Sequence, residues 1–174
     1  MSDLTPDLTL RRALPADLDA IMVLERGPGY EALVGRSTRT QHEAMLYGAR
    51  HVYLVGERET PVAFALLRDL DDAHGNVYLQ RIAVAQPGRG EGARFLSAVI
   101  DWAFANSVAH RFHLDCFDDN FRAQAMYAKL GFTRDGLLRE AYLDSEGRRR
   151  TLVMMALTRT EWLQAARSST TSAP

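Results

Sequence analysis

Apolar residues along the chain follow two spacings, one typical of helices and one typical of strands. The strongest helical pattern covers residues 90–107, where one face is apolar at steps of three and four residues. That face consists of Leu96, Val99, Ile100, Ala103 and Phe104. Shorter helical patterns, bounded by capping residues or glycines, cover residues 18–25, 38–48, 120–130 and 160–166.

Runs rich in β-branched and aromatic residues predict the strands. They cover residues 8–13, 51–57, 61–68, 77–85, 112–116, 132–139 and 151–158. The second and third runs flank a short polar turn, as do the last two, which is the pattern of hairpins. The strand–helix–strand unit at 77–116 instead requires a parallel pair with a right-handed crossover. The expected fold is therefore α/β, with a mixed, mostly antiparallel sheet and helices on both faces.

Composition limits the class of protein. The 174 residues are 47% hydrophobic and 25% charged, with a net charge of −1, which is ordinary for a globular protein. We expect one domain over residues 1–166 and a disordered tail over residues 167–174. The near-zero net charge argues against nucleic acid or an anionic membrane as a partner. No apolar run approaches the ~18 residues of a membrane span.

The start of the chain and its cysteine content bear on location. The first ten residues carry early acids and no basic region ahead of an apolar core, so we expect no secretory signal. The single cysteine, Cys116, excludes an internal disulfide, which fits a cytoplasmic protein. Cysteine and histidine residues do not have the spacing of metal ligands, so we expect no metal.

The stretch 77–94 carries the strongest chemical signal, because a strand leads through a glycine-rich loop into a helix. Backbone N–H groups at such a helix start suit a phosphate, although the glycines also fit an ordinary turn. The letters of Gly88–Ala93 match the dinucleotide pattern G-x-G-x-x-A, with Asp115 ending the next strand. Gln86 and Pro87 separate these glycines from the strand, and too little chain follows for further parallel units. A kinase-type phosphate loop is absent from the sequence.

The residues Arg89–Arg94 (RGEGAR) resemble the pyrophosphate loop R/Q-x-x-G-x-G/A of the GNAT N-acetyltransferases, with Arg94 in place of the last small residue. Residues 120–132 resemble the family's N-x-x-A-x-x-x-Y-x-x-x-G-F block. Residues 136–140 and the closing MMALTRTEW are similar to the branch that includes ribosomal-protein alanine and spermidine acetyltransferases. The resemblance implies a GNAT-like sheet splayed at its central parallel strands. It also implies direct transfer of an acetyl group from acetyl-CoA to a primary amine in a ternary complex.

The resemblance further implies a role for each matched residue. The loop would hold the pyrophosphate, the preceding strand would pair with the pantetheine arm and polarise the acetyl carbonyl, and Asn120 would reach the arm. Tyr127 would be the catalytic acid that protonates the leaving thiolate. The implied cofactor-binding residues are Ile82, Ala83, Val84, Arg89, Gly90, Glu91, Gly92, Ala93, Arg94 and Asn120. Spacing alone also fits Asn120 as a helix cap and Tyr127 as a buried aromatic residue.

A general base does not stand out in the sequence. The candidates are His51, His110, His113, Glu25, Asp115, Asp118 and Glu140. Cys116 is a weak candidate for a nucleophile, because no Cys-His-Asp arrangement accompanies it. The three arginines at 148–150 are expected at a solvated hairpin tip.

Two other functions stay open at this point. The chain could be a non-catalytic acyl-CoA-binding or sensing module on the same fold, or a nucleotide-dependent oxidoreductase. The acceptor amine is not specified either: an N-terminal residue, a polyamine, an amino acid and a drug-like amine all fit. We expect it to enter from the side built by residues of about 25–40 and the last hairpin. A homodimer is compatible with the sequence.

Overall fold

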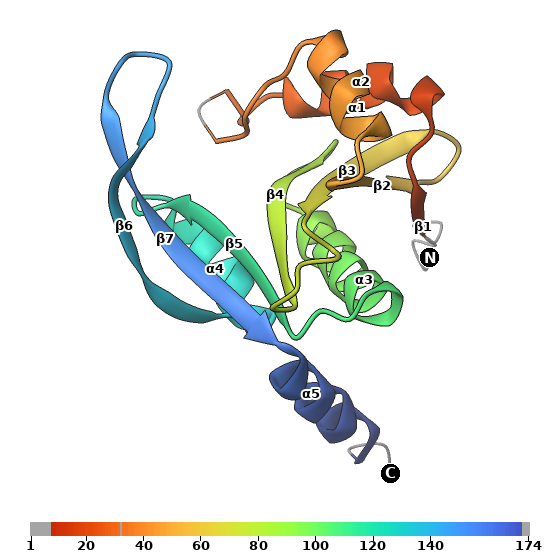
Figure 1. Ribbon diagram of the computed structural model, residues 1–174, viewed down its shortest axis with the longest axis vertical. Coiled ribbons are helices and arrows are strands. Elements are labelled where there is room, and N and C mark those ends of the chain that lie inside the picture. The colour runs from red at the N-terminus through yellow and green to blue at the C-terminus, as the bar shows by residue number, and fades with distance from the viewer. Residues whose placement is uncertain (1–7, 32, 172–174) are drawn as a thin grey trace. The chain divides into compact units, whose positions relative to one another are not determined.

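The computed structural model describes residues 8–31 and 33–171 (Figure 1). The elements are β1 (Thr9–Arg12), a 3₁₀ turn (Pro15–Asp17), α1 (Leu18–Glu25), α2 (Arg39–Tyr47), β2 (His51–Glu57), β3 (Pro61–Arg68), β4 (Asn76–Val84), α3 (Glu91–Asn106), β5 (Arg111–Phe117), α4 (Phe121–Lys129), β6 (Thr133–Leu143), β7 (Arg149–Thr158) and α5 (Arg159–Thr171). Each predicted helix and strand is confirmed, and the larger differences lie in the last hairpin and the last helix. Within the described ranges, no helix is both long and apolar enough to cross a membrane.

The seven strands form one sheet in the order β1-β2-β3-β4-β5-β7-β6. β4 and β5 are parallel, with Tyr78 opposite His113, as the crossover through α3 requires. The pairs β1–β2, β5–β7 and β6–β7 are antiparallel, so the predicted mixed sheet is confirmed. The pairing of β4 with β5 covers Asn76–Leu79, and β4 then continues to Val84.

The chain forms two compact units, which are described separately. The first unit consists of the chain up to Leu67 together with Arg81–Val99. The second consists of Arg68–Gln80 together with the chain from Ile100 onwards. The end of β4 and the start of α3 therefore belong to the first unit, and the start of β4 and the end of α3 belong to the second.

In the first unit, helices cover both faces of the strands. On one face, side chains of α1 pack in a buried cluster with side chains of β2, β3 and β4: Leu18, Ile21, Leu24, Tyr53, Val55, Phe64, Leu66 and Ala83. On the other face, α3 approaches β2 at Gly56, where an added Cβ would lie 2.9 Å from the ring of Phe95. This close approach is available only to glycine.

The second unit has an aromatic core. The ring centroids of Phe104 and Phe112 are 6.4 Å apart, and those of Phe112 and Phe132 are 6.0 Å apart. The ring of Tyr127 lies 5.8 Å from that of Phe132. These rings connect α3, β5 and α4, so the aromatic residues hold the elements of this unit together.

Helix α4 has the boundaries that the sequence predicts. The side-chain Oδ1 of Asn120 accepts a hydrogen bond from the N–H of Ala123 at 3.1 Å, which caps the first turn. Gly131 follows the helix with φ 93°, a conformation that glycine adopts without strain. The cap at Asn120 and the glycine at 131 therefore set the ends of the helix through interactions with nearby residues.

The last hairpin is longer than predicted, since β6 continues to Leu143 and β7 begins at Arg149. Asp144 organises its turn, because its Oδ1 accepts hydrogen bonds from the N–H groups of Glu146 and Arg148 at 3.0 and 2.8 Å. Most of β6 is exposed to solvent. Its residues therefore lack the apolar alternation from which a strand end is predicted.

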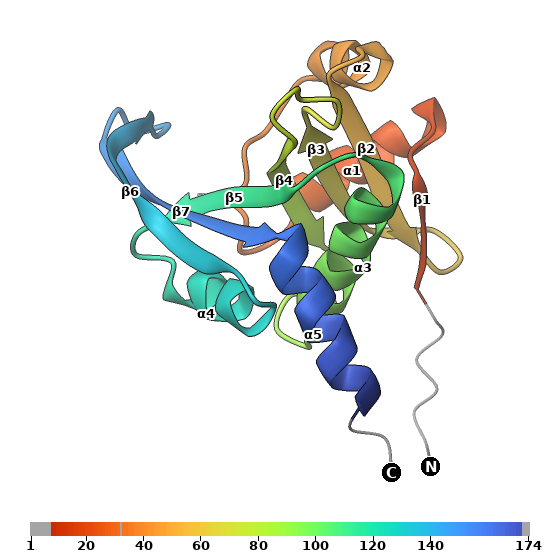
Figure 2. The same ribbon diagram turned by 60° about the horizontal axis from the view of Figure 1, so that its bottom comes forward.

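Helix α5 is attached to the end of α3. The guanidinium of Arg159 donates hydrogen bonds of 2.7–3.1 Å to the carbonyls of Phe104, Ser107 and Ala109. One turn later, Trp162 donates to Asp101 at 2.7 Å, and its ring lies 5.1 Å from that of Phe104. Figure 2 shows α5 continuing directly from β7. Arg159 thus binds one carbonyl in the last turn of α3, that of Phe104, and two carbonyls just beyond the end of the helix.

The predicted disordered tail is wrong over part of its length. Helix α5 continues past Ala166 to Thr171. The sequence has no glycine or proline after Trp162 until Pro174, so nothing in it interrupts the helix. Residues 172–174 of the predicted tail lie outside the described residues.

Replacing Arg159 with alanine removes the donor to these carbonyls. We expect Arg159→Ala to lower the free energy of unfolding by about 2 kcal/mol, because hydrogen bonds to a charged group are lost together. Urea denaturation measures this change. Arg149→Ala, at an exposed position of β7, is the matched control and should change stability by less than about 0.5 kcal/mol. Equal stability of the two variants would show that Arg159 does not hold α5 in place.

Candidate active site

The loop between β4 and α3 turns through two glycines with positive φ. Gly88 and Gly90 have φ of 102° and 78°, which other residues rarely adopt. The N–H of Arg94 donates to the carbonyl of Gly90 at 3.1 Å. The amides of Glu91, Gly92 and Ala93 precede this bond and lie in the first turn of α3, where N–H groups point out of the helix end.

Arginines gather at this loop in the first unit. Arg58 donates to Oε1 of Glu91 at 2.7 Å, while Oε2 of Glu91 is buried without a hydrogen-bond partner among the described residues. An added Cβ at Gly90 would lie 3.9 Å from the guanidinium of Arg94. The Arg94 side chain thus folds back toward the start of its own helix, a direction that the sequence left undetermined. Arg89 is exposed, so the loop offers cationic side chains together with helix N–H groups.

The end of β4 contacts a tyrosine from the loop after α1. The N–H of Val84 donates to the hydroxyl of Tyr30 at 2.9 Å, and that hydroxyl donates to the carbonyl of Val84 at 3.1 Å. The next residue, Ala85, donates its N–H to Val62 of β3 at 2.8 Å. Sequence reasoning did not identify Tyr30, because it lies in a glycine-rich loop without periodicity.

A buried polar network also lies in the first unit. Glu25 is fully buried and accepts hydrogen bonds from Ser37 N–H at 3.1 Å and from Arg81 at 3.3 Å. Its other contacts are His42 at 3.2 Å and Arg26 at 2.6 Å. Burial raises the pKa of Glu25, but the hydrogen bonds with His42 and Ser37 and the charge of Arg81 outweigh it and hold the pKa below its usual value. Glu25 is therefore an ionised structural group, and its full burial and lowered pKa make it a poor general base.

In the second unit, Tyr127 of α4 is 7% exposed and packs against Phe132. Asn120 begins the same helix. The alternative that Tyr127 is a buried aromatic residue is thus confirmed as a description of its packing. A phenol can pack through its ring and react through its hydroxyl, so this packing is compatible with the catalytic role that the resemblance implies.

Polar side chains share one face of β4 and β5 in the second unit. The core residues Val77, Leu79, Phe112 and Leu114 alternate with them and lie on the other face. Tyr78 donates a hydrogen bond to Asp115 at 2.7 Å and stacks on His113 with ring centroids 5.1 Å apart. Gln80 is the next residue of β4 on this face. Its Oε1 and the Nδ1 of His113 are buried without a hydrogen-bond partner among the described residues.

Burial shifts the pKa values of the titratable side chains on this face. Burial raises the pKa of Asp115, and the hydrogen bond from Tyr78 and the charge of Arg68 offset only part of the rise. Burial lowers the pKa of His113, and the positive charges of Arg111 and Arg68 lower it further. Asp115 is therefore a carboxylate with raised basicity, beside polar atoms for which the described residues supply no partner.

Other candidates from the sequence fit less well. Cys116 is a buried free thiol, and burial and the nearby Asp115 raise its pKa to about 11, so it is a poor nucleophile near neutral pH. Asp118 is exposed at the end of β5. No group of three or more His, Cys, Asp or Glu residues in the described ranges is arranged to hold a metal ion.

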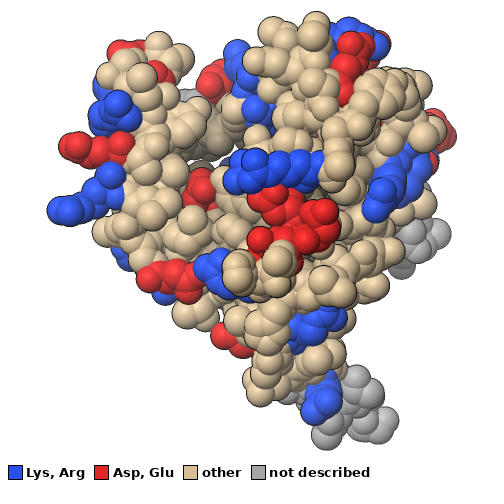
Figure 3. Space-filling view, in the orientation of Figure 1, with Lys and Arg blue, Asp and Glu red and all other residues tan. Residues whose placement is uncertain are grey.

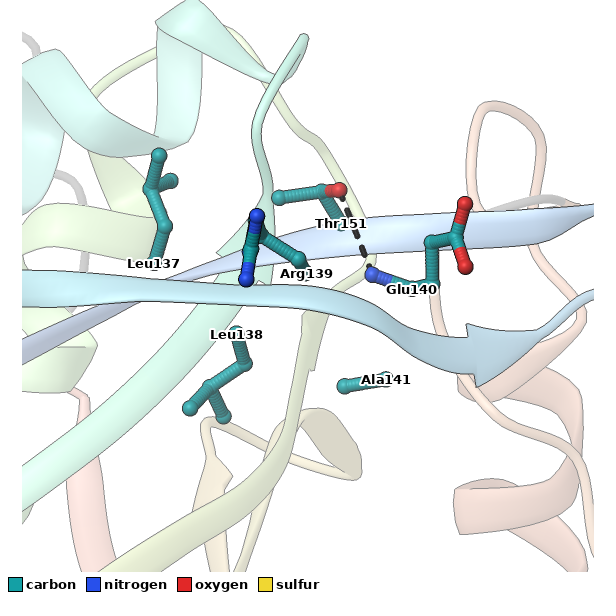
Figure 4. Close-up of a pocket in the computed structure, with 6 residues that line it drawn as sticks. All are labelled: Leu137, Leu138, Arg139, Glu140, Ala141 and Thr151. Atoms are coloured by element: carbon teal, nitrogen blue, oxygen red, sulfur yellow. Dashed lines mark hydrogen bonds between the residues drawn. The ribbon is translucent and has the colours of Figure 1, made fainter.

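The last hairpin carries a pocket of about 820 Å³ (Figure 4). Its lining residues are Leu137, Leu138, Arg139, Glu140, Ala141 and Thr151. A register shift in β6 lies between Leu138 and Tyr142, and within it Glu140 has φ 54°, while its N–H donates to Thr151 Oγ1 at 3.4 Å. A bulge with a strained residue often re-aims side chains at a functional site. Figure 3 shows both acidic and basic side chains on the visible face, with one group of acidic side chains gathered near its middle.

Known proteins share this fold. The spermidine/spermine N-acetyltransferase SpeG of Vibrio cholerae, in mutant forms, matches with a TM-score of 0.79 and 19% identity, covering 91% of this chain and 98% of that one. The spermidine N-acetyltransferase of the same organism, in complex with CoA and spermine, matches with a TM-score of 0.76 and 20% identity over 90% and 98% of the chains. NAA60 of Arabidopsis thaliana, in complex with acetyl-CoA, matches with a TM-score of 0.73 and 16% identity over 88% and 99%.

The sequence carries a more specific match than the fold does. The family model described as the acetyltransferase (GNAT) family matches residues 18–132. That range includes β4, the glycine loop, the start of α3 and all of α4. The chain therefore belongs to the GNAT family and is an acetyl-CoA-dependent N-acetyltransferase.

Proposed function

We propose that the first unit of this enzyme binds the coenzyme. The amides at the start of α3 and the arginines Arg89 and Arg94 hold the pyrophosphate, since helix N–H groups and cationic side chains both favour an anion. The backbone of Ile82–Val84 pairs with the pantetheine arm, and one of its N–H groups polarises the acetyl carbonyl. The positive φ of Gly88 and Gly90, which exposes the first amides of α3, is the observation that most directly supports this assignment.

Tyr127 is the proposed acid and Asp115 the proposed base. The amine nitrogen attacks the thioester carbon, so a C–N bond forms and the C–S bond breaks. Tyr127 gives its proton to the departing thiolate. Asp115 takes the proton that the amine loses, because its raised pKa makes it a better base than an ordinary aspartate. The hydrogen bond from Tyr78 holds the carboxylate in place. Asn120 caps α4 and also reaches the pantetheine arm.

The acceptor is an amine, and the proposed acid and base, Tyr127 and Asp115, do not determine its chemical class. Polyamines are the first acceptors to test, because SpeG is named as a spermidine/spermine N-acetyltransferase. Glu140 and the apolar Leu137 and Leu138 line a pocket on the hairpin, and an extended cation with methylene segments fits such a combination. We further propose that the reaction takes place in the cytoplasm, where the free thiol of Cys116 stays reduced.

Binding of acetyl-CoA should raise the melting temperature of the protein, whereas NAD should not, because the loop is built for the coenzyme. Arg89→Glu should raise the acetyl-CoA dissociation constant about ten-fold, since a cation near the phosphates becomes an anion. Arg134→Glu, at an exposed position of β6, is the matched control and should bind normally. Stabilisation by NAD alone would contradict the proposal.

The same protein is then supplied with acetyl-CoA and a panel of amines, and release of the CoA thiol is followed with a thiol reagent. The panel contains spermidine, spermine, free amino acids and short peptides with free N-termini. Thiol release that depends on one amine class identifies the acceptor. Tight binding of acetyl-CoA without thiol release for any of these amines would show that the acceptor belongs to none of the classes in the panel.

Replacing Tyr127 with phenylalanine keeps the ring against Phe132 and removes the proposed acid. We expect Tyr127→Phe to lower kcat about a hundred-fold, the lower range for loss of a general acid, with little change in the acetyl-CoA dissociation constant. Steady-state kinetics and calorimetry measure the two quantities. Tyr47→Phe, on the exposed face of α2, is the matched control. Unchanged turnover would remove Tyr127 as the acid.

The base assignment predicts a pH dependence. Asp115 accepts a proton only when ionised, so kcat/KM should fall as the pH drops through its pKa, which burial places above the usual aspartate value. Asp115→Asn should lower kcat/KM about a hundred-fold and abolish this acidic limb. The limb due to protonation of the amine itself should persist. Asp118→Asn, at the exposed end of β5, should keep the wild-type profile, and an Asp115→Asn profile identical to it would exclude Asp115.

A further inference from the structure

At the end of β4, the strand edge that faces away from β3 has a hydrogen-bonding pattern of its own. Ala85 donates its N–H to Val62 of β3. Successive residues of an extended chain direct their backbone groups to opposite edges, and the N–H and C=O of one residue point the same way. The N–H and C=O of Val84 therefore point away from β3. That edge is the one at which a further strand, or a strand-like ligand, would pair with the end of β4.

The hydroxyl of Tyr30 occupies this edge. It accepts from the N–H of Val84 at 2.9 Å and donates to the C=O of Val84 at 3.1 Å. In a sheet these two groups would pair with the C=O and N–H of a residue on the neighbouring strand. One phenol oxygen can take both parts because it is a donor and an acceptor at once. Tyr30 thus substitutes for a strand at this position.

The surroundings of Tyr30 hold it in this place. Its ring packs against the buried cluster formed by α1, β2, β3 and β4. Its N–H donates to the carbonyl of Gly27 at 3.1 Å, and an added Cβ at Gly27 would lie 3.6 Å from the ring. At the start of this loop, Arg26 donates to the carbonyl of Ser37 at 2.7 Å. The ring is half-buried, so the hydroxyl reaches Val84 from an anchored position rather than from a free side chain.

We propose that Tyr30 is an internal competitor of the coenzyme, whose hydroxyl occupies the backbone groups of Val84 until acetyl-CoA displaces it. The inference rests on the proposed function, in which the pantetheine arm pairs with Ile82–Val84. The pantetheine arm and the Tyr30 hydroxyl would both bind the N–H and C=O of Val84. Only one of them can therefore bind at a time. Acetyl-CoA pairs only with molecules in which Tyr30 has left Val84. Its apparent affinity therefore falls as the fraction of molecules with Tyr30 bound to Val84 rises. In the empty enzyme the same contact covers a strand edge that would otherwise be open.

The test compares wild type with Tyr30→Phe, which keeps the packed ring and removes only the hydroxyl. Calorimetry should show that acetyl-CoA binds at least about five-fold more tightly to Tyr30→Phe, because the lost hydroxyl makes two hydrogen bonds to Val84 and a single one is worth about that factor. In the free protein, hydrogen exchange of the Val84 amide should be faster in Tyr30→Phe. Tyr47→Phe, whose ring is exposed on α2, is the matched control and should match wild type in both measurements.

The outcomes separate this proposal from the function on which it rests. If wild type binds acetyl-CoA and Tyr30→Phe binds it equally or more weakly, the competitor role is overturned and the coenzyme assignment stands. If neither protein binds acetyl-CoA, both the coenzyme assignment and the competitor role are overturned. Binding by Tyr30→Phe alone would support both, with a stronger competition than expected.

Discussion

The backbone of strand β4 has different hydrogen-bond partners at its start and at its end. Its residues Asn76–Leu79 pair in parallel with β5, and the strand then continues to Val84. Backbone N–H and C=O groups that leave a ladder require other partners. At Val84 these are supplied by a tyrosine from a different part of the chain. The same groups suit the amide-bearing arm of coenzyme A, so the chemistry of the site depends on how this strand ends.

The charges of the first unit are paired in ways that support this strand. Arg81 of β4 bonds to the buried Glu25 at 3.3 Å and to Ser37 Oγ at 2.9 Å, and Gly35 lies close to its guanidinium. A buried carboxylate is tolerated only when such partners compensate its lost hydration. Removing one partner would leave the other charge buried and alone. The network therefore ties β4 to α1 and to the loop after it, which is the loop that carries Tyr30.

In the second unit, the proposed acid lies on a helix and the proposed base on a strand, and different contacts hold each of them in place. Tyr127 lies on a short helix that is capped by Asn120 and ended by Gly131. Asp115 lies on a central strand whose opposite face is in the core. A carboxylate on such a strand is partly desolvated because of its neighbours in the sheet, and its pKa rises for that reason. The basicity of Asp115 is thus set by the packing around it.

The sequence by itself determined the elements, their order and the family, because these depend on local signals. The 3.6-residue period of α3, the glycines of the loop and the cap at Asn120 act over a few residues, and the motif around Tyr127 can be read as letters. Only the tertiary structure decided the partners. Tyr30 and Val84 are 54 residues apart, and Tyr78 and Asp115 are 37 apart. The length of β6 and of α5 was also missed, since an exposed edge strand lacks alternation and a polar tail lacks a stop signal. Hydrogen bonds between distant residues, and the pKa shifts that burial causes, exist only once the strands have paired. For that reason the sequence could indicate the acid and the phosphate loop, while the choice of Asp115 among the candidate bases, and the tyrosine at the strand edge, depended on the fold.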